Sequence, residues 1–260
     1  MHLRASPSIL VTVITPSAAL IVVGSEVLSA KIRDENGPWA AERLQQLGVR
    51  LAAIATIPDD LALIAETVAR ERARVDWLFT SGGVGPTHDD VTVAGVARAL
   101  GVPVRRSPEL VAVLREGHRR WQGTEIPEAA LRMADVPEGT RLEGDPEFPV
   151  LVVENVVMLP GVPRFFRAQF AHFAERLAAS PFRVASLYVK LSEDCFAADL
   201  ERVQSEYADV QIGSYPRFDD GLDHRVRLTF ESKDPVRVAA ARDAFLARIP
   251  VGAVVRGEGP

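Results

Sequence analysis

Cysteine is nearly absent from the sequence: Cys195 is the only one among 260 residues. A single cysteine excludes an intramolecular disulfide and a zinc site made of cysteines. We interpret Cys195 as a small buried apolar residue rather than as a nucleophile. Because chains with so little cysteine are typical of reducing compartments, we expect the protein to be cytoplasmic.

Long apolar runs and concentrated positive charge are also missing. No run reaches the about 20 apolar residues that a membrane-spanning helix requires, so we expect no membrane partner. The 30 Lys and Arg residues are scattered among 35 Asp and Glu residues, which gives a net charge of -5. Without a basic patch, we expect no nucleic acid partner. Residues 1–18 lack the basic region and apolar core of a signal peptide, and they are predicted to form a disordered tail.

Apolar residues make up 47% of the chain, which is enough for a substantial core in one large or two modest domains. A continuous apolar strand at 19–23 and a second strand at 49–57 alternate with amphipathic helices. Pro38 suits the first turn of one helix, and Asp59 or Asp60 can cap the other. When strands and helices alternate in such short steps, right-handed crossovers must connect the successive parallel strands. It predicts an α/β domain with a mostly parallel sheet over residues 19–180.

Two later regions break this alternation. Residues 127–149 are rich in turn formers and charges, and they predict an irregular segment with one short helix near 129–133. After residue 180 the order is strand, helix, strand, strand, helix. This order predicts a separate, small α+β domain over residues 181–260.

The most informative stretch is a glycine-rich loop, Ser81 to Thr92, which joins an apolar strand to an amphipathic helix. Gly82, Gly83 and Gly85 permit positive φ angles and let backbone N–H groups approach a ligand. The N-terminus of the following helix adds partial positive charge, so the loop predicts a phosphate site. It matches neither the dinucleotide fingerprint nor the P-loop.

The adjacent carboxylates Asp89 and Asp90 have two interpretations. They could cap the following helix by accepting hydrogen bonds from its first N–H groups. Alternatively, at least one could hold a divalent cation that bridges to a phosphate, because hard oxygen ligands suit magnesium or manganese. The spacing alone does not decide between them.

Several other loops should lie beside this one, because ligands of parallel sheets bind beyond the carboxyl ends of the strands. The loops at Ser25-Glu26 and Asp59-Asp60 follow two such strands. A Pro160-Gly161 turn follows a strand at 156–159, and it either brings another backbone segment to the crevice or is a plain turn.

Motifs along the chain together resemble those of the molybdopterin-binding domain family, which includes the N-terminal part of competence-damage-inducible protein A. The likeness is strongest to the molybdopterin-binding-like domain of eukaryotic FAD synthase, and it covers about residues 20–249. It implies a three-layer domain followed by a small KH-type α+β domain. The motifs are Gly24-Ser25-Glu26-Val27-Leu28, Asp34-Glu35-Asn36, Pro58-Asp59-Asp60, Gly82 to Thr92, Leu159-Pro160-Gly161-Val162-Pro163 and Gly213-Ser214-Tyr215-Pro216.

The resemblance implies a metal-dependent hydrolase of ADP-containing pyrophosphates, of the FAD or ADP-ribose type, that releases AMP. Asp90, helped by Asp59 and Glu26, would position a divalent ion (Mg, Mn or Co), and Asp89 could act as a general base. The remaining residues implied to bind the nucleotide or pterin phosphate are Ser25, Asn36, Ser81, Gly82, Gly83, Val84, Gly85, Thr87, Thr92, Pro160 and Gly161.

Two other functions stay open: molybdopterin binding or adenylylation, and a non-catalytic nucleotide- or pterin-binding module. Ser25 stands where the family usually has Asp, which weakens a metal role in the first loop, and Glu35 stands where Thr is common. We expect neither an amidase nor an adenylyltransferase domain after Pro260, and the KH-type domain has no GXXG loop to hold nucleic acid. The resemblance further implies a homo-oligomer, either a dimer or a trimer.

Overall fold

The computed structural model describes residues 15–218 and 221–259, which form two compact units, 15–179 and 180–259. Residues 1–14 of the expected tail lie outside the described part. Within that tail, residues 17 and 18 already belong to the first strand, because β1 spans Ser17–Val23. Its side chains are buried on both faces, so the strand begins two residues before the expected domain boundary.

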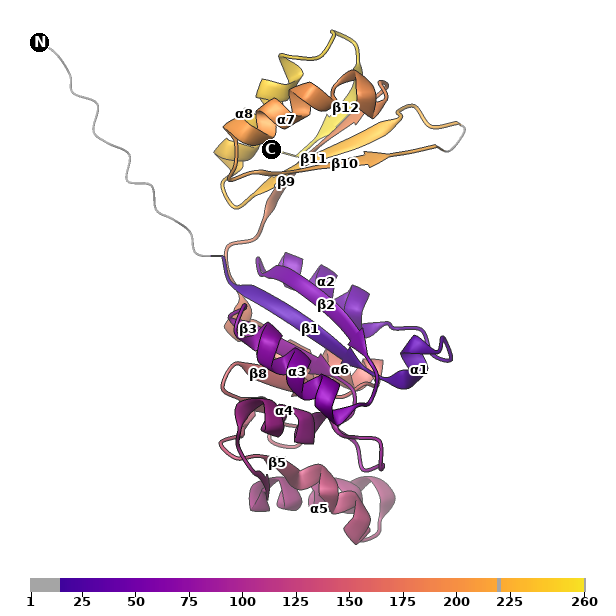
Figure 1. Cartoon of the computed structure of the whole chain (residues 1–260), viewed down its shortest axis with the longest axis vertical. Coiled ribbons are helices and arrows are strands. Elements are labelled where there is room, and N and C mark those ends of the chain that lie inside the picture. The colour runs from indigo at the N-terminus through magenta and orange to yellow at the C-terminus, as the bar shows by residue number, and fades with distance from the viewer. Residues whose placement is uncertain (1–14, 219–220, 260) are drawn as a thin grey trace, which may run out of the picture. The chain divides into compact units, whose positions relative to one another are not determined.

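The first unit is built on a six-stranded sheet with the order β2-β1-β3-β8-β7-β6 (Figure 1). The pairs β1–β2, β1–β3 and β3–β8 are parallel, whereas β7 and β6 add antiparallel strands at one edge. The predicted mostly parallel α/β sheet is therefore confirmed. The bounds are β2 Arg50–Ile57, β3 Trp77–Ser81, β6 Arg141–Glu143, β7 Val150–Val153 and β8 Val156–Leu159.

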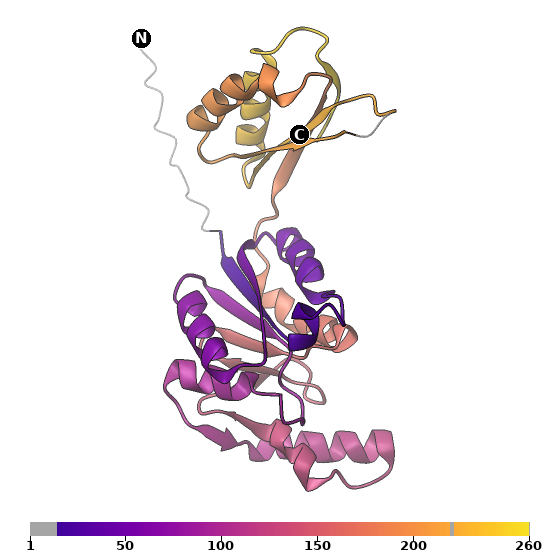
Figure 2. The same ribbon diagram turned by 45° about the vertical axis from the view of Figure 1, so that its right-hand side comes forward.

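Helices cover both faces of this sheet and make three layers (Figures 1 and 2). One apolar core lies between the sheet and α2 and α6, and includes Leu44 and Phe170. The second lies between the sheet and α3 and α4, and includes Ile64 and Val96. These helices are α2 Asn36–Gln46, α3 Leu61–Arg72, α4 Thr92–Leu100 and α6 Pro163–Leu177.

The segment expected to be irregular contains more structure than the sequence indicated. The short helix near 129–133 is confirmed as a 3-10 helix, η1 Glu128–Ala134. β5 (Asp135–Pro137) follows it and pairs with β4 (Val104–Arg106), while β6 joins the main sheet. Three-residue strands give too short a period-2 pattern to be recognised. The unit also contains α1 Ser25–Leu28 and α5 Pro108–Gln122.

The second unit is a four-stranded antiparallel sheet with the order β10-β11-β9-β12. Two helices, α7 and α8, pack on one face around Phe230 and Phe245, so the predicted small α+β domain is confirmed. The strand β12 was not predicted. The bounds are β9 Arg183–Val189, η2 Glu193–Cys195, α7 Ala197–Glu206, β10 Gln211–Pro216, β11 Val226–Ser232, α8 Pro235–Leu246 and β12 Val254–Glu258.

Cys195 is exposed, and the prediction of a buried apolar role was wrong. It ends the 3-10 turn η2, and its Sγ lies 3.6 Å from Oγ of Ser192. The buried side chain at this turn is instead the neighbouring Phe196. None of the helices in the described residues is both long and apolar enough to span a bilayer.

Candidate functional site

The carboxyl ends of four strands converge on the glycine-rich loop. Gly24, after β1, donates from its N–H to the carbonyl of Ile57 at the end of β2, at 3.0 Å. Gly82, after β3, donates to the carbonyl of Leu159 at the end of β8, also at 3.0 Å. A Cβ on Gly82 would lie 2.3 Å from the carbonyl oxygen of Val23, so only glycine fits between these strand ends. The expected meeting of the loops is confirmed.

Asn36, the first residue of α2, joins this helix to two of the strand ends. Its side-chain Nδ2 donates to Oγ of Ser81 at 2.9 Å and to the carbonyl of Gly161 at 2.8 Å. The residue is 4% exposed, and no described residue partners its Oδ1. Both amide hydrogens are therefore used within the protein. Asn36 can only accept a hydrogen bond from a ligand, a narrower role than the one expected.

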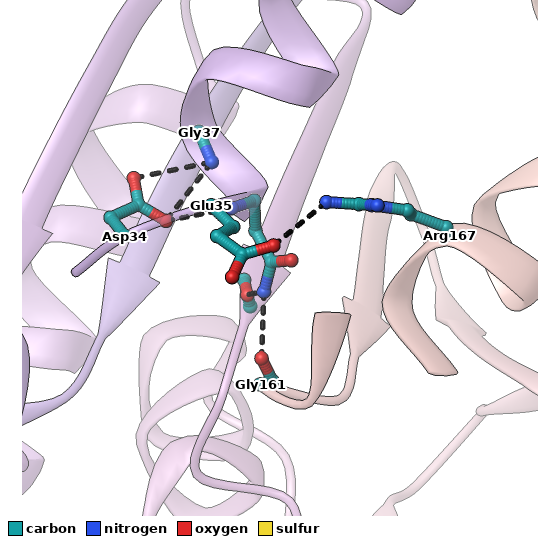
Figure 3. A network of polar contacts seen from close by, with 7 residues as sticks. Asp34, Glu35, Gly37, Gly161 and Arg167 are labelled. Carbon is teal, nitrogen blue, oxygen red and sulfur yellow. Dashed lines mark hydrogen bonds and ion pairs between the residues drawn. The ribbon is translucent and has the colours of Figure 1, made fainter. Parts of the chain in front are cut away.

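Asp34 fixes the start of α2, a role that the sequence reasoning missed. Its Oδ1 accepts hydrogen bonds from the N–H groups of Asn36 at 2.9 Å and Gly37 at 3.1 Å. An acidic residue two positions before the first helical residue is a recognisable capping signal. Its neighbour Glu35 forms an ion pair of 3.0 Å with Nη2 of Arg167 on α6 (Figure 3). Glu35 thus pairs at the surface, although it stands at a motif position.

The glycine-rich loop keeps its shape through positive φ angles and its own hydrogen bonds. The φ angles are +97° at Gly82 and +66° at Gly83, but that of Gly85 is not positive. The hydroxyl of buried Thr92 donates to the carbonyl of Gly82 at 2.8 Å, and the N–H of Thr92 donates to the carbonyl of Gly83 at 3.0 Å. Thr92 therefore holds the loop to α4, and its hydroxyl hydrogen is not free for a ligand.

The donors left for an anion differ from those expected. The N–H of Gly82 already binds Leu159, so its predicted contact with a phosphate is wrong. For the N–H groups of Gly83, Val84 and Gly85, no hydrogen-bond acceptor is found among the residues that the structure describes. Three successive N–H groups without internal acceptors favour an anion near the loop.

Asp90 closes the loop instead of capping the helix. The N-cap position of α4 is Val91, which makes no side-chain capping bond, so the capping interpretation of Asp89 and Asp90 was wrong. Asp90 Oδ2 accepts hydrogen bonds from the N–H of Thr87 at 2.8 Å and from its hydroxyl. The same oxygen would lie 2.7 Å from a Cβ on Gly85, so this glycine is needed for the approach.

Asp89 is exposed, and the ionised form of its carboxylate is favoured. The Thr87 hydroxyl, which can donate to Asp89 only when it does not donate to Asp90, lowers the pKa of Asp89. The backbone amide of Asp89 and Coulombic attraction from His88 act in the same direction. A carboxylate with a lowered pKa is a weak base at neutral pH. This favours Asp89 as a fixed negative charge rather than as the general base suggested by the resemblance.

Ser25 and Asp59 bridge the first two loops reciprocally. The N–H of Ser25 donates to Oδ2 of Asp59 at 2.8 Å, and Oγ of Ser25 accepts from the N–H of Asp59 at 3.3 Å. Asp60 is a helix cap, because its side chain accepts from the N–H of Leu63 at 2.8 Å. Glu26 lies close to Gly24, with Oε1 2.7 Å from the position of a Cβ there.

The expected metal site does not exist as a preformed cluster. Within residues 15–218 and 221–259, no three Asp, Glu, His or Cys side chains are grouped so that they could hold a metal ion. Glu26, Asp59 and Asp90 therefore do not form a three-carboxylate centre. Asp59 and Asp90 each use Oδ2 within the protein and keep Oδ1 unpartnered by the described residues. These two carboxylate oxygens fit only an ion that is also bound by water and by the phosphate groups of a bound substrate, as is common for magnesium.

Two pockets of the described residues are lined by other segments, one of about 570 Å³ beside α5 and one of about 360 Å³ beside β10. The candidate site is instead a surface of backbone donors and carboxylates at the strand ends. Pro160 and Gly161 lie beside it, since a Cβ on Gly161 would be 3.2 Å from Cα of Gly82.

Two protein families match consecutive parts of the chain. The family described as "Probable molybdopterin binding domain" matches residues 19–179, and the family "FAD synthase, middle domain" matches residues 181–258. A protein of Archaeoglobus fulgidus is 32% identical over 228 residues, which are 87% of this chain and 95% of that protein. These matches agree with the resemblance deduced from the motifs.

Relatives with more specific names are longer. A probable FAD synthase of Caenorhabditis elegans is 32% identical over 243 residues, covering 84% of this chain and 47% of that protein. A CinA-like protein of Thermotoga maritima is 30% identical over 225 residues, covering 84% of this chain and 54% of that protein. The chain thus spans about half the length of these two relatives.

Among solved structures, that of CinA from Thermoplasma acidophilum matches the chain. It has a TM-score of 0.56 and 27% sequence identity, and the match covers 63% of this chain and 98% of that one. The fold of the first unit, its motifs and the family matches agree. The chain belongs to the family of probable molybdopterin binding domains, followed by a domain of the FAD synthase middle-domain family.

Proposed function

We propose that the chain hydrolyses an ADP-containing nucleotide pyrophosphate of the FAD or ADP-ribose type and releases AMP. The observation that carries the proposal is the row of N–H groups of Gly83, Val84 and Gly85, which have no internal acceptors in the described residues, beside Asp90. Backbone donors at the start of a helix suit a phosphate group. The names of the FAD synthase and CinA-like relatives support a nucleotide as the ligand.

The loop would bind one phosphate of the pyrophosphate through these N–H groups. Hydrogen bonds aimed at the phosphate oxygens stabilise the charge that develops when the bridging P–O bond breaks. Asp90, whose Oδ1 has no partner in the described part of the chain, would accept a hydrogen bond from the attacking water and orient it. The hydrolysis adds one water molecule across the P–O–P link and gives AMP and the other monophosphate.

A divalent ion would enter together with the nucleotide and neutralise part of its phosphate charge. The free Oδ1 atoms of Asp90 and Asp59 would hold it, with Glu26 as the third candidate. We propose magnesium, manganese or cobalt. Because the three carboxylates do not form a group, we expect no tight metal binding without nucleotide.

The test is to incubate the full chain with FAD or ADP-ribose and each metal, and to measure AMP by chromatography. Asp90→Asn keeps an acceptor for Thr87 but removes the charge, so loss of AMP release would come from the charge and not from collapse of the loop. Asp243→Asn, at an exposed position on α8, is the matched control and should retain full activity. Release of AMP at an unchanged rate by Asp90→Asn would contradict the proposal.

A non-catalytic nucleotide- or pterin-binding module is the second candidate. Two observations favour it: Ser25 replaces the usual acidic residue, and the described carboxylates form no three-membered metal group. Binding without turnover with every metal would support it. The description of the matched family favours molybdopterin as the ligand in that case, and a pterin that co-purifies with the chain would identify it.

A further inference from the structure

A row of alternating tyrosine and arginine residues crosses the sheet of the second unit. Tyr215 on β10 is paired with Arg227 on β11, Arg227 with Tyr188 on β9, and Tyr188 with Arg256 on β12. Successive side chains of a strand point to opposite faces of the sheet. The residues on either side of Arg227, Val226 and Leu228, are buried in the core with the helices. The four residues of the row therefore lie on the face without helices.

The two ends of this row differ in available charge. The guanidinium of Arg256 lies 3.8 Å from the centre of the Tyr188 ring and forms ion pairs with Asp223 at 2.8 Å and Glu258 at 3.6 Å. The guanidinium of Arg227 lies 5.4 Å from the centre of the Tyr215 ring. In the described residues no carboxylate pairs with Arg227. Within residues 15–218 and 221–259, positive charge is therefore neutralised at the Tyr188 end of the row but has no carboxylate partner at the Tyr215 end.

The Tyr215 ring lies across a position where a side chain is missing. A Cβ on Gly213 would be 2.7 Å from the Tyr215 hydroxyl oxygen and 2.8 Å from both Cε2 of Tyr215 and Oγ1 of Thr229. The ring thus covers Gly213 and lies along the sheet. Tyr215 is nevertheless 50% exposed, so much of the ring remains open to solvent.

A pocket of about 360 Å³ opens at this end of the row. It is lined by Ser214, Tyr215, Pro216, Arg217 and Arg227. Within the described part of the chain, neither Arg217 nor Arg227 has an ion-pair partner. Among the described residues, the pocket therefore combines an aromatic ring with two guanidinium groups that no carboxylate pairs. Its volume is near the lower limit for small-ligand sites, which is about 300 Å³.

From this combination we infer that the second unit carries its own site for a mononucleotide, with the base stacked on Tyr215 and the phosphate bound by Arg217 and Arg227. Guanidinium groups match the geometry of phosphate and also stack on planar rings. An aromatic ring stacks with every base because each base presents a π-face. This site is separate from the glycine-rich loop, and it does not depend on the function proposed there.

A single nucleotide fits this surface better than a nucleic acid strand. Strand-binding surfaces follow the backbone with a continuous positive groove. Here the row is positive only at one end, because Asp223 and Glu258 neutralise Arg256. The net charge of the chain, -5, also opposes a polyanion.

The test is photolabelling of the full chain with 8-azidoadenosine monophosphate, followed by mass spectrometry of its peptides. We expect label on a peptide from residues 211–232 and competition by excess AMP. Arg227→Gln and Tyr215→Leu should each weaken AMP competition for this label about tenfold, because each removes a charged hydrogen bond or a stacking contact. Arg202→Gln, an exposed arginine on α7, is the matched control and should not change it.

Gly213→Ala gives a second test that leaves every proposed contact group in the chain. The added methyl must displace both the Tyr215 ring, which is half exposed, and the hydroxyl of the buried Thr229. We expect weaker labelling of a chain that stays folded. Labelling confined to peptides of residues 15–179 would overturn the inference without touching the function proposed for the first unit. Competition by oligothymidylate that strengthens with its length and exceeds that of AMP would also overturn it.

Discussion

The side-chain amide of Asn36 donates a hydrogen bond of 2.8 Å to the carbonyl of Gly161, a residue 125 positions further along the chain. The second hydrogen of the same amide is donated to Ser81. One buried side chain thus connects the start of α2 with the ends of β3 and β8, beside the loop that we propose binds phosphate. Stability and ligand binding should therefore depend on the same residue.

Asn36→Ala should lower the free energy of unfolding by about 1–3 kcal/mol, because it removes two hydrogen bonds and leaves buried partners unsatisfied. It should also weaken binding of AMP or inorganic phosphate at the loop. Asn155 provides a matched control, since its amide donates to two carbonyls, those of Arg72 and Val75, at 3.0 and 3.2 Å. Asn155→Ala should cost similar stability in urea unfolding but leave binding unchanged. Equal loss of binding in both variants would contradict a local role for Asn36.

Alanine substitutions of Gly83 and Gly101 separate the free energy of unfolding lost to a positive φ angle from that lost to a steric clash. Their φ angles are +66° and +69°, but a Cβ on Gly83 would lie 2.2 Å from Oγ1 of Thr92, whereas nothing lies within 4 Å of one on Gly101. Gly101→Ala should therefore cost only about 1–2 kcal/mol, the penalty of a left-handed residue. Gly83→Ala should cost more in the same urea titration, and it should also weaken phosphate binding. Equal costs would show that the loop can move away from Thr92.

The sequence predicted the parts of the fold that follow from regular patterns. Buried strands such as 19–23 and the alternation with helices were sufficient for the parallel sheet, and the strand ends then predicted that Ser25, Asp59 and the glycine-rich loop would lie close together. The short strands β4, β5 and β6 were missed. β4 and β5 lie far apart in the sequence, whereas β6 pairs with the nearby β7. In each case three residues carry too little periodicity to reveal a strand.

Within the site, the sequence identified the residues better than their contacts. The motif includes both Gly82 and Asp90, but it cannot tell that the Gly82 N–H is used by Leu159 or that Asp90 accepts from Thr87 rather than from the helix. The first contact depends on the approach of β8, which lies far away in sequence, and the second on the local turn of the loop. The same applies to Cys195, whose exposure follows from the turn η2 and not from its residue type.

Asp76 should make stability depend on pH in the acid range. The Ser17 hydroxyl and the Ser17 N–H both donate to Asp76 Oδ2 at 2.7 Å, and these bonds lower the pKa of Asp76 in the folded protein. A lowered pKa means that the folded state binds its proton less readily than the unfolded chain. The stabilisation is therefore complete above the ordinary carboxyl pKa, about 4, and is lost as the pH falls through the lowered value.

Asp76→Asn should retain hydrogen-bond acceptance from Ser17 but remove this titration. The difference in unfolding free energy between pH 6 and pH 3 should be smaller in the variant than in the wild type. Urea titrations at several pH values measure it. Asp243→Asn, an exposed position in the second unit, serves as the control for a general change in charge. A pH dependence identical to that of the wild type would exclude Asp76 as a contributor.

Gly95 should be required for the close packing of α4 on α3. A Cβ on Gly95 would lie 2.4 Å from Cγ2 and 2.8 Å from Cβ of Ile64, which is fully buried. Gly95→Ala should therefore lower the free energy of unfolding by about 1–3 kcal/mol through overpacking, although alanine is the better helix former. In α5, Gly117 has nothing within 4 Å, so Gly117→Ala should be neutral or stabilising.

A double-mutant cycle tests whether contact with Ile64 causes the loss of stability expected in Gly95→Ala. Ile64→Ala removes the Cγ2 atom, so Gly95→Ala should cost less in the Ile64→Ala background than in the wild type. Because the two residues are in contact, we expect a coupling free energy of about 1 kcal/mol or more from urea unfolding of the four proteins. Additive costs would mean that the added methyl meets the Cβ of residue 64, 2.8 Å away and retained in the alanine variant, and not the Cγ2 atom.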